Sequence, residues 1–157
     1  MAKKNRGKEF EGIFQNDWQR TFPNTFFLRL KDDVSMNYGN AKNPCDFLCM
    51  PKDNLFMIET KTHYDNRFPF SDLSQYESLV SYRNCPNVIP GVIIWFIDYD
   101  RVLFYHIDEI TKMKRDGLKS INLRKEKEFN RYHYIEIPSK KKRVFMESDY
   151  SILVYNK

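Results

Sequence analysis

The segment between residues 44 and 62 constrains the fold most strongly, because both strands of a β-hairpin and its turn are visible in it. Two apolar runs, Phe-Leu-Cys-Met at 47–50 and Leu-Phe-Met-Ile at 55–58, are separated by Pro-Lys-Asp-Asn at 51–54. Proline, asparagine and aspartate are typical of turns, and short apolar runs on either side of a turn are typical of paired strands. The sequence therefore predicts strands at about 45–50 and 55–62.

The length of the turn sets the register of this hairpin. A four-residue loop pairs Met50 with Leu55, and counting outwards places Asp46 opposite Glu59. Cross-strand neighbours have Cβ atoms about 4.5–5.5 Å apart, where two like charges repel each other. Lys61 falls on the same face as Glu59, because side chains alternate along a strand. A divalent cation between the carboxylates would remove the repulsion, and Mg²⁺ favours one or two carboxylates together with water and phosphate oxygens.

The composition predicts one globular domain covering residues 1–157, which is long enough to bury a core. Hydrophobic residues make up 41% of the chain, as in ordinary globular proteins. The net charge of +5 indicates a mild preference for polyanions, although many basic proteins never bind nucleic acid.

Three features predict a cytoplasmic protein without a membrane segment. The cysteines, Cys45, Cys49 and Cys85, are odd in number and lack disulfide or zinc spacing, so we expect them to be reduced. The basic N-terminus has no apolar segment behind it, which argues against a signal peptide. The longest apolar stretch, 88–97, is too short to span a bilayer.

An amphipathic helix is predicted at residues 8–20, because Phe10, Phe14 and Trp18 fall on one face. Glu11 falls at the margin of this apolar face, where we expect a carboxylate to be partly buried and to have a partner. The alternative is a solvated glutamate near the helix start, which the helix dipole favours.

The remaining pattern places further helices and strands around the hairpin. Ser71 is a suitable N-cap for a helix at 72–83, and the continuous apolar run at 91–97 is typical of a strand buried on both faces. The order is helix, three strands, helix and two strands, which predicts an α/β fold with a mixed central sheet flanked by helices. The predicted core covers about 7–110 and is followed by basic strands at about 118–157; the other predicted elements are strands at 25–30, 102–105 and 132–137, a loop at 31–43 and a short helix at 108–115.

Two close carboxylates and a lysine on one strand pair suit metal-assisted cleavage of a phosphodiester. The metal activates water and neutralises developing charge, while the lysine positions that water and offers positive charge to the transition state. We expect Asp46 and Glu59 to be metal ligands, with the backbone carbonyl of Thr60 as a third. Lys61 is then the water-positioning group. The alternative is a surface Glu59–Lys61 pair, with Asp46 capping the start of a strand.

These residues resemble the PD-(D/E)XK nuclease superfamily. The matching pattern is Pro-Cys-Asp at 44–46 and Glu-Thr-Lys at 59–61, behind a helix that carries Glu11, with Cys45 inserted between the proline and the aspartate of the motif. Within the superfamily the chain looks most like the RecU-type Holliday-junction resolvases, including phage-encoded relatives, over about residues 7–110. The further matching segments are Gly-Lys-Glu-Phe-Glu at 7–11, Phe-Pro-Phe at 68–70, Gln75, Gly-Val-Ile-Ile-Trp-Phe at 91–96 and Phe-Tyr-His-Ile at 104–107.

The resemblance implies a restriction-endonuclease-like αβββαβ core, a homodimer, and dependence on Mg²⁺, with Mn²⁺ as an alternative. It implies symmetric nicking of four-way junctions in branched double-stranded DNA, and it makes Glu11 and Gln75 supporting active-site residues. RecU-type proteins carry a long stalk between their first two strands, whereas the connection here, 31–43, is short. A nuclease with a reduced stalk is therefore expected.

Recognition of a junction by its shape predicts contacts with the DNA backbone, which give salt-dependent and sequence-independent affinity. Arg67 is the strongest candidate, because its loop follows directly from the strand of Glu59. The alternatives are a surface histidine at His63 and a solvated turn at 140–143. The full set of candidate cations is Lys3, Lys4, Arg6, Lys8, His63, Arg67, Lys140, Lys141, Lys142 and Arg143.

Two other functions stay open on these residues. One is a different DNA nuclease of the same fold, of the restriction or replication type. The other is a non-catalytic DNA-binding module on this fold. The set Asp46, Glu59 and Lys61 argues against a module of this kind, because a binder gains nothing from carboxylates that face phosphate.

Overall fold

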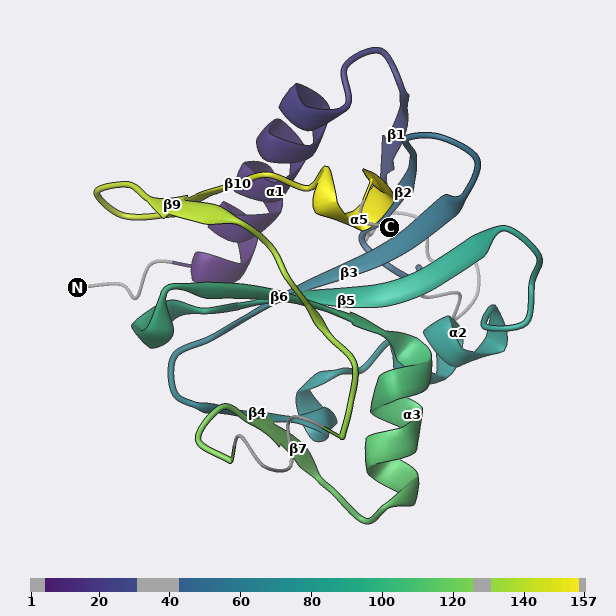
Figure 1. The fold of residues 1–157 in the computed structure, drawn as a ribbon, viewed down its shortest axis with the longest axis vertical. Coiled ribbons are helices and arrows are strands. Elements are labelled where there is room, and N and C mark those ends of the chain that lie inside the picture. Colours follow the sequence, from purple (N-terminus) through teal and green to yellow (C-terminus); the bar gives the residue numbers. More distant parts are fainter. Residues whose placement is uncertain (1–4, 31–42, 126–130, 156–157) are drawn as a thin grey trace, which may run out of the picture.

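The computed structural model describes residues 5–30, 43–125 and 131–155. Its centre is a mixed six-stranded sheet with the strand order β1-β2-β3-β5-β6-β8 (Figure 1). β3 and β5 run parallel, and the other neighbouring pairs in this sheet are antiparallel. The strands of the sheet are β1 (Phe26–Arg29), β2 (Phe47–Met50), β3 (Leu55–His63), β5 (Val88–Phe96), β6 (Arg101–His106) and β8 (Ile135–Glu136).

Helices and two small strand pairs cover the two faces of the sheet (Figure 1). One face packs against α1, the β9–β10 pair and α5, and the other packs against α2, α3 and the β4–β7 pair. The predicted α/β fold with a mixed central sheet flanked by helices is confirmed. The covering elements are α1 (Arg6–Thr21), β4 (Arg67–Pro69), η1 (Phe70–Asp72), α2 (Tyr76–Ser81), η2 (Ile97–Tyr99), α3 (Ile107–Arg115), β7 (Ser120–Asn122), β9 (Ser139–Lys141), β10 (Met146–Ser148) and α5 (Ile152–Tyr155).

The first helix is docked on the sheet by the aromatic face that its sequence predicts. Asn5 caps α1, and its side-chain oxygen accepts a hydrogen bond from the N–H of Lys8 at 3.2 Å. Phe10, Phe14 and Trp18 are buried between α1 and the sheet. Each of these rings contributes about 1.5–3 kcal/mol by leaving water. The docking fixes where Glu11, on the same helix, lies relative to the strands.

The predicted register of the hairpin is confirmed, since Phe47 of β2 pairs with Ile58 of β3. Asp46 precedes β2, and its N–H donates to the carbonyl of Ile58 at 3.0 Å. β3 continues for five residues beyond Ile58, to His63. Asp46 and Glu59 therefore lie where β2 begins and β3 extends past it.

The strand next to β3 is as strongly buried as its apolar run predicts. β5 pairs with β3 over nine residues and with β6 on its other side, and Ile93 and Ile94 are fully buried. Gly91 allows β6 to lie close, because a Cβ at this position would come within 2.4 Å of the Phe104 ring. The parallel β3–β5 pair thus gives the second half of β3 a rigid support.

The second helix of the chain, α2, is shorter than the helix predicted at 72–83. Residue 70 begins the 3-10 turn η1, and the cap of α2 is Gln75 in place of the predicted Ser71. The N–H of Phe70 donates to the carbonyl of Lys119 at 2.9 Å, next to the pairing of β4 with β7. This contact, distant in sequence, holds the chain against β7 and delays the start of the helix.

The C-terminal region differs in part from the basic strands predicted at about 118–157. The strand predicted at 132–137 is reduced to the two residues of β8, and the last apolar segment forms the helix α5. None of the helices in the described ranges is long and apolar enough to cross a membrane. Lys3, Lys4 and residues 31–42, which include most of the predicted loop and the reduced stalk, lie outside the described residues. The single domain at 1–157 stays a prediction.

Candidate active site

Glu59 and Lys61 lie on one face of β3 and form an ion pair. The Lys61 Nζ is 3.3 Å from the Glu59 Oε1. The Glu59 side chain is only 2% exposed, whereas that of Lys61 is partly exposed. The alternative of a surface Glu59–Lys61 pair does not describe this geometry, because the carboxylate is buried in the fold.

Asp46 is held in place by its neighbour on β3. Its Oδ2 accepts two hydrogen bonds from Thr60, one from the backbone N–H and one from the hydroxyl, each 2.9 Å long. The described hydrogen bonds of this carboxylate all end at Oδ2. Oδ1 has no hydrogen-bond donor among the described residues, and Thr60 fixes the direction in which it points.

Burial makes the ionised form of Glu59 unfavourable. Burial and, after it, the nearby charge of Asp46 raise the pKa of Glu59 to about 8, while Lys61 acts in the opposite direction. The second oxygen, Oε2, is buried and has no hydrogen-bond partner among the described residues. A buried oxygen without a partner destabilises the fold unless something else binds it.

These features fit a divalent cation. Asp46 and Glu59 would hold it, because each has an oxygen without a described partner and a cation would offset the repulsion between them. The described residues contain no group of three or more histidine, cysteine or acidic side chains arranged for a metal. Water and phosphate oxygens would complete the coordination, as Mg²⁺ prefers. The backbone carbonyl of Thr60 as a third ligand stays a prediction.

Glu11 is partly buried and paired, as its place on the helix predicts. It forms an ion pair with Arg29 of β1. Glu11 is also close enough to contribute, after the larger effects, to the raised pKa of Glu59. Arg29 was not among the predicted site residues. The sequence feature that could have identified Arg29 is its position two residues after Phe27, on the face of β1 that packs towards α1.

Gln75 is not joined to the carboxylates by any described contact. Its side-chain oxygen accepts a hydrogen bond from the Ser74 hydroxyl at 2.8 Å. It lies at the N-cap of α2, on the same side of the sheet as Met57 of β3. Its role as a supporting active-site residue stays a prediction.

The two predicted cations that follow β3 are tethered to neighbouring segments. His63 packs against the rings of Phe68 and Phe96, and its Nε2 is 2.8 Å from the Asp65 Oδ1. The Arg67 guanidinium donates to the Ser120 hydroxyl at 2.9 Å while remaining exposed. Both side chains border the end of the strand that carries Glu59 and Lys61.

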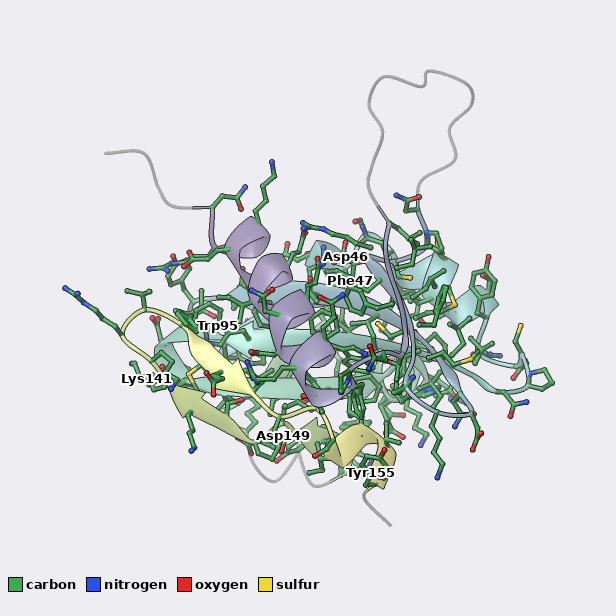
Figure 2. All side chains as sticks on the ribbon, turned by 90° about the horizontal axis from the view of Figure 1, so that it is seen from above. Asp46, Phe47, Trp95, Lys141, Asp149 and Tyr155 are labelled. Carbon is green, nitrogen blue, oxygen red and sulfur yellow. The ribbon has the colours of Figure 1, made fainter. Side chains whose placement is uncertain are left out.

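The start of α1 contacts the β9–β10 hairpin, and both segments carry predicted DNA-binding cations. The Arg6 guanidinium donates to the carbonyl of Val144, between β9 and β10, at 3.4 Å. Lys141 and Asp46 lie on opposite sides of α1 in the view of Figure 2. The exposed predicted cations in these two segments are Lys8, Lys140, Lys141, Lys142 and Arg143, of which Lys141 pairs with Asp100 and Lys142 with Glu147.

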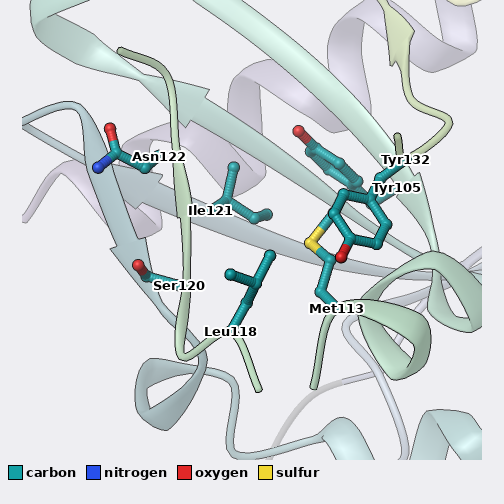
Figure 3. Close-up of a pocket in the computed structure, with 7 residues that line it drawn as sticks. All are labelled: Tyr105, Met113, Leu118, Ser120, Ile121, Asn122 and Tyr132. Carbon is teal, nitrogen blue, oxygen red and sulfur yellow. The ribbon is translucent and has the colours of Figure 1, made fainter. Parts of the chain in front are cut away.

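A small cavity lies on the face of the sheet that α2, α3 and the β4–β7 pair cover, between β6, α3 and β7 (Figure 3). The Tyr105 hydroxyl beside it is buried without a described partner. Neither a carboxylate nor a lysine lines the cavity, so it is separate from the site at Asp46 and Glu59; the lining residues are Tyr105, Met113, Leu118, Ser120, Ile121, Asn122 and Tyr132.

Comparison with known proteins shows what kind of fold this is. The chain matches no family model, and no curated protein matches it in sequence. Among 17 solved chains that match is the Holliday junction resolvase Hjc of the archaeal hyperthermophile Archaeoglobus fulgidus. The two share 16% sequence identity and a TM-score of 0.50, over 66% of this chain and 78% of the resolvase. The chain therefore has the nuclease-like fold of that resolvase.

Proposed function

We propose that the chain is a divalent-metal-dependent endonuclease that cleaves branched DNA, and in particular four-way junctions, in the manner of the RecU-type resolvases. One observation carries the proposal: the buried Glu59, with an unpartnered oxygen, lies beside Asp46 and Lys61. The likeness of fold to a Holliday junction resolvase supports the choice of substrate.

Each residue of the site has a distinct task in this proposal. A bound divalent cation lowers the pKa of water and neutralises charge on the phosphodiester. Asp46 and Glu59 hold that cation, and Thr60 keeps Asp46 in one orientation. Lys61 offers a positive charge and a hydrogen-bond donor to the attacking water or to the phosphate oxygens. Burial of Glu59 keeps competing water away from one side of the site.

Glu11 and Arg29 support this arrangement from the neighbouring helix and strand. The ion pair neutralises the charge of Glu11 close to the two metal-holding carboxylates. It also ties α1 to β1, next to Asp46, whose carbonyl accepts a hydrogen bond from the N–H of Leu30 at 2.8 Å. We expect loss of either partner to disturb the position of the site more than its chemistry.

The predicted cations would bind DNA through phosphates. Arg67 and His63 lie beside the end of β3. Lys8 and Arg6 on α1, together with the β9–β10 hairpin at 140–143, provide further positive charge. Affinity built from such contacts falls steeply with salt and depends little on sequence.

A homodimer is part of the proposal, because two symmetric nicks require two sites related by a two-fold axis. A cytoplasmic location in a bacterial or phage-infected cell belongs to it as well. The dimer predicts a mass in solution of twice the 19.0 kDa of one chain. Light scattering coupled to size exclusion measures it, and a single-chain mass in the presence of junction DNA would contradict it.

The preference for branched DNA is tested by comparing two DNA molecules that have the same base sequences in their arms. An immobile four-way junction and the corresponding linear duplex are incubated with the protein and Mg²⁺. We expect paired nicks near the branch of the junction and much slower cleavage of the duplex. Equal cleavage of both would replace the junction resolvase with a general nuclease of the same fold.

A further inference from the structure

An exposed aromatic side chain lies at the end of β3, the strand that carries Glu59 and Lys61. Tyr64 directly follows β3 and is 52% exposed. Its backbone is held in place, because its carbonyl accepts a hydrogen bond from the N–H of Asp98 at 3.3 Å. Side chains alternate along the strand, so Tyr64 falls on the same side as Thr60, which orients Asp46, and on the opposite side from Glu59 and Lys61.

Tyr64 is joined to the cationic start of α1. The Arg6 guanidinium lies close to the Tyr64 side chain and forms an ion pair with Glu9 at 3.0 Å. Arg6 also donates to the carbonyl of Val144, whose side chain is 45% exposed. Two exposed residues, Tyr64 and Val144, thus lie close to one arginine.

The surroundings of this contact are positively charged. Lys8 is exposed on the first turns of α1, and Lys142 and Arg143 are exposed in the turn that precedes Val144. A cationic surface attracts the DNA backbone, and an aromatic ring within it offers a face on which a base can stack. A surface that bound phosphates alone would gain nothing from the ring.

The spacing along β3 fits a single strand of DNA. Tyr64 is four residues from Thr60, or about 13 Å at the rise of a strand. This equals about four steps of a stacked DNA strand, whose rise along the helix axis is about 3.4 Å per nucleotide. A DNA strand with its scissile phosphate at Asp46, which Thr60 holds, would therefore reach Tyr64 on the α1 side of β3 a few nucleotides away.

We propose that Tyr64 stacks on an unpaired base at the branch point, and that this contact favours branched DNA over intact duplex; the inference rests on the proposed function. In an intact duplex the faces of each base are covered by its neighbours, and exposing one costs unstacking and unpairing energy. At a branch that cost is smaller. The ring therefore discriminates by the state of the base, without reading its identity.

The experiment measures binding and stacking without cleavage. Four-way junctions with 2-aminopurine at single positions near the branch, and the matching duplexes, are titrated with protein in EDTA. We expect wild-type protein to quench the fluorescence at one position of the junction. Tyr64→Ala should abolish this quenching and weaken junction binding about 5- to 100-fold, as base–aromatic stacking predicts, with duplex binding unchanged within about twofold.

Two variants control for other roles of the side chain. Tyr64→Phe keeps the ring but not the hydroxyl that contacts Arg6, so it should bind and quench like the wild type. Tyr155→Ala removes a side chain that is 62% exposed on α5, which lies apart from Asp46 in Figure 2, and it should change neither readout. Equal losses on junction and duplex with Tyr64→Ala, or equal damage by Phe and Ala, would overturn the inference.

Nicking with Mg²⁺ separates this inference from the proposed function. If the wild type and Tyr64→Ala nick the junction with the same preference over duplex, stacking is refuted and the nuclease stands. If the wild type nicks no DNA but Tyr64→Ala loses the quenching and the junction affinity, stacking stands and the nuclease is refuted.

Discussion

Thr60 donates two hydrogen bonds to one oxygen of Asp46, from its backbone N–H and from its hydroxyl, and both are 2.9 Å long. A residue of β3 thereby fixes a carboxylate that lies before the start of β2. Among the described residues, no hydrogen bond reaches the other oxygen of Asp46 or the buried Oε2 of Glu59. The position of the proposed metal site thus depends on the pairing of two strands.

Replacing Thr60 by valine tests this relationship. Thr60→Val keeps the shape and the backbone N–H but removes the hydroxyl donor to Asp46. We expect a loss of about 10- to 100-fold in metal affinity or cleavage rate, as for other groups that orient metal ligands. The Mg²⁺ dependence of junction nicking measures it. Thr62→Val, on the same strand, is the control, and equal effects of the two variants would contradict a specific role of Thr60.

Glu59 should link metal binding to stability. Mg²⁺ binds only the folded protein in this account, so it should raise the melting temperature of the wild type, and the increase should grow with the logarithm of the Mg²⁺ concentration above the Kd. Glu59→Gln removes a ligand and should abolish both this increase and the cleavage. Its metal-free form should fold, because a neutral amide replaces a buried carboxyl group. The measurement is thermal unfolding with and without Mg²⁺, and a normal Mg²⁺ response of the variant would exclude Glu59 as a ligand.

Asp17 should give the stability a dependence on pH. Burial raises its pKa above the ordinary value, although the N–H of Ser148 and the charge of Arg20 oppose the shift. The folded state then holds this proton more tightly than the unfolded state, so the free energy of unfolding falls as the pH rises through the folded pKa. Asp17→Asn should therefore gain stability relative to the wild type as the pH rises above about 4, the ordinary pKa of an aspartate.

Asp149 provides the control of opposite sign. Hydrogen bonds from Ser151 lower its pKa, so its contribution to stability is lost as the pH falls. Asp149→Asn should lose stability relative to the wild type as the pH rises. Chemical denaturation at several pH values measures both variants, and parallel trends would refute the assigned pKa directions.

Any side chain at position 91 should destabilise the fold. A Cβ there would lie 2.4 Å from the Phe104 Cε2 and 2.9 Å from the carbonyl oxygen of Tyr105. Gly91→Ala should cost about 1–3 kcal/mol through overpacking of the β5–β6 pair. Gly12→Ala is the matched change, because nothing lies within 4 Å of its Cβ, and in a helix it should stabilise by about 0.5–1 kcal/mol. Equal unfolding free energies for the two variants would contradict this packing.

The parts of the fold that the sequence predicts well are those set by local patterns. The hairpin register follows from a four-residue turn between two apolar runs, and the pairing of Phe47 with Ile58 agrees with it. The docking face of α1 follows from the spacing of its aromatic residues. In the same way, Asp46, Glu59 and Lys61 could be placed together because a single strand pair carries all three.

The parts that it does not predict depend on contacts between distant segments. The segment before α2 is held by the hydrogen bond of Phe70 with Lys119, which no local pattern signals. The partner of Glu11 is Arg29, eighteen residues away on β1. The contact of Arg6 with Val144 joins residues 138 positions apart, so the proximity of the hairpin to α1 had to come from the structure.

The most direct test of the metal site is nicking of an immobile four-way junction by the wild type and Asp46→Asn at the same Mg²⁺ concentration. Asp53→Asn, in the exposed turn of the same hairpin, is the control. The wild type and Asp53→Asn should nick at equal rates that EDTA abolishes, whereas Asp46→Asn should bind the junction without nicking it. Nicking by Asp46→Asn at the wild-type rate would contradict the assignment of the site.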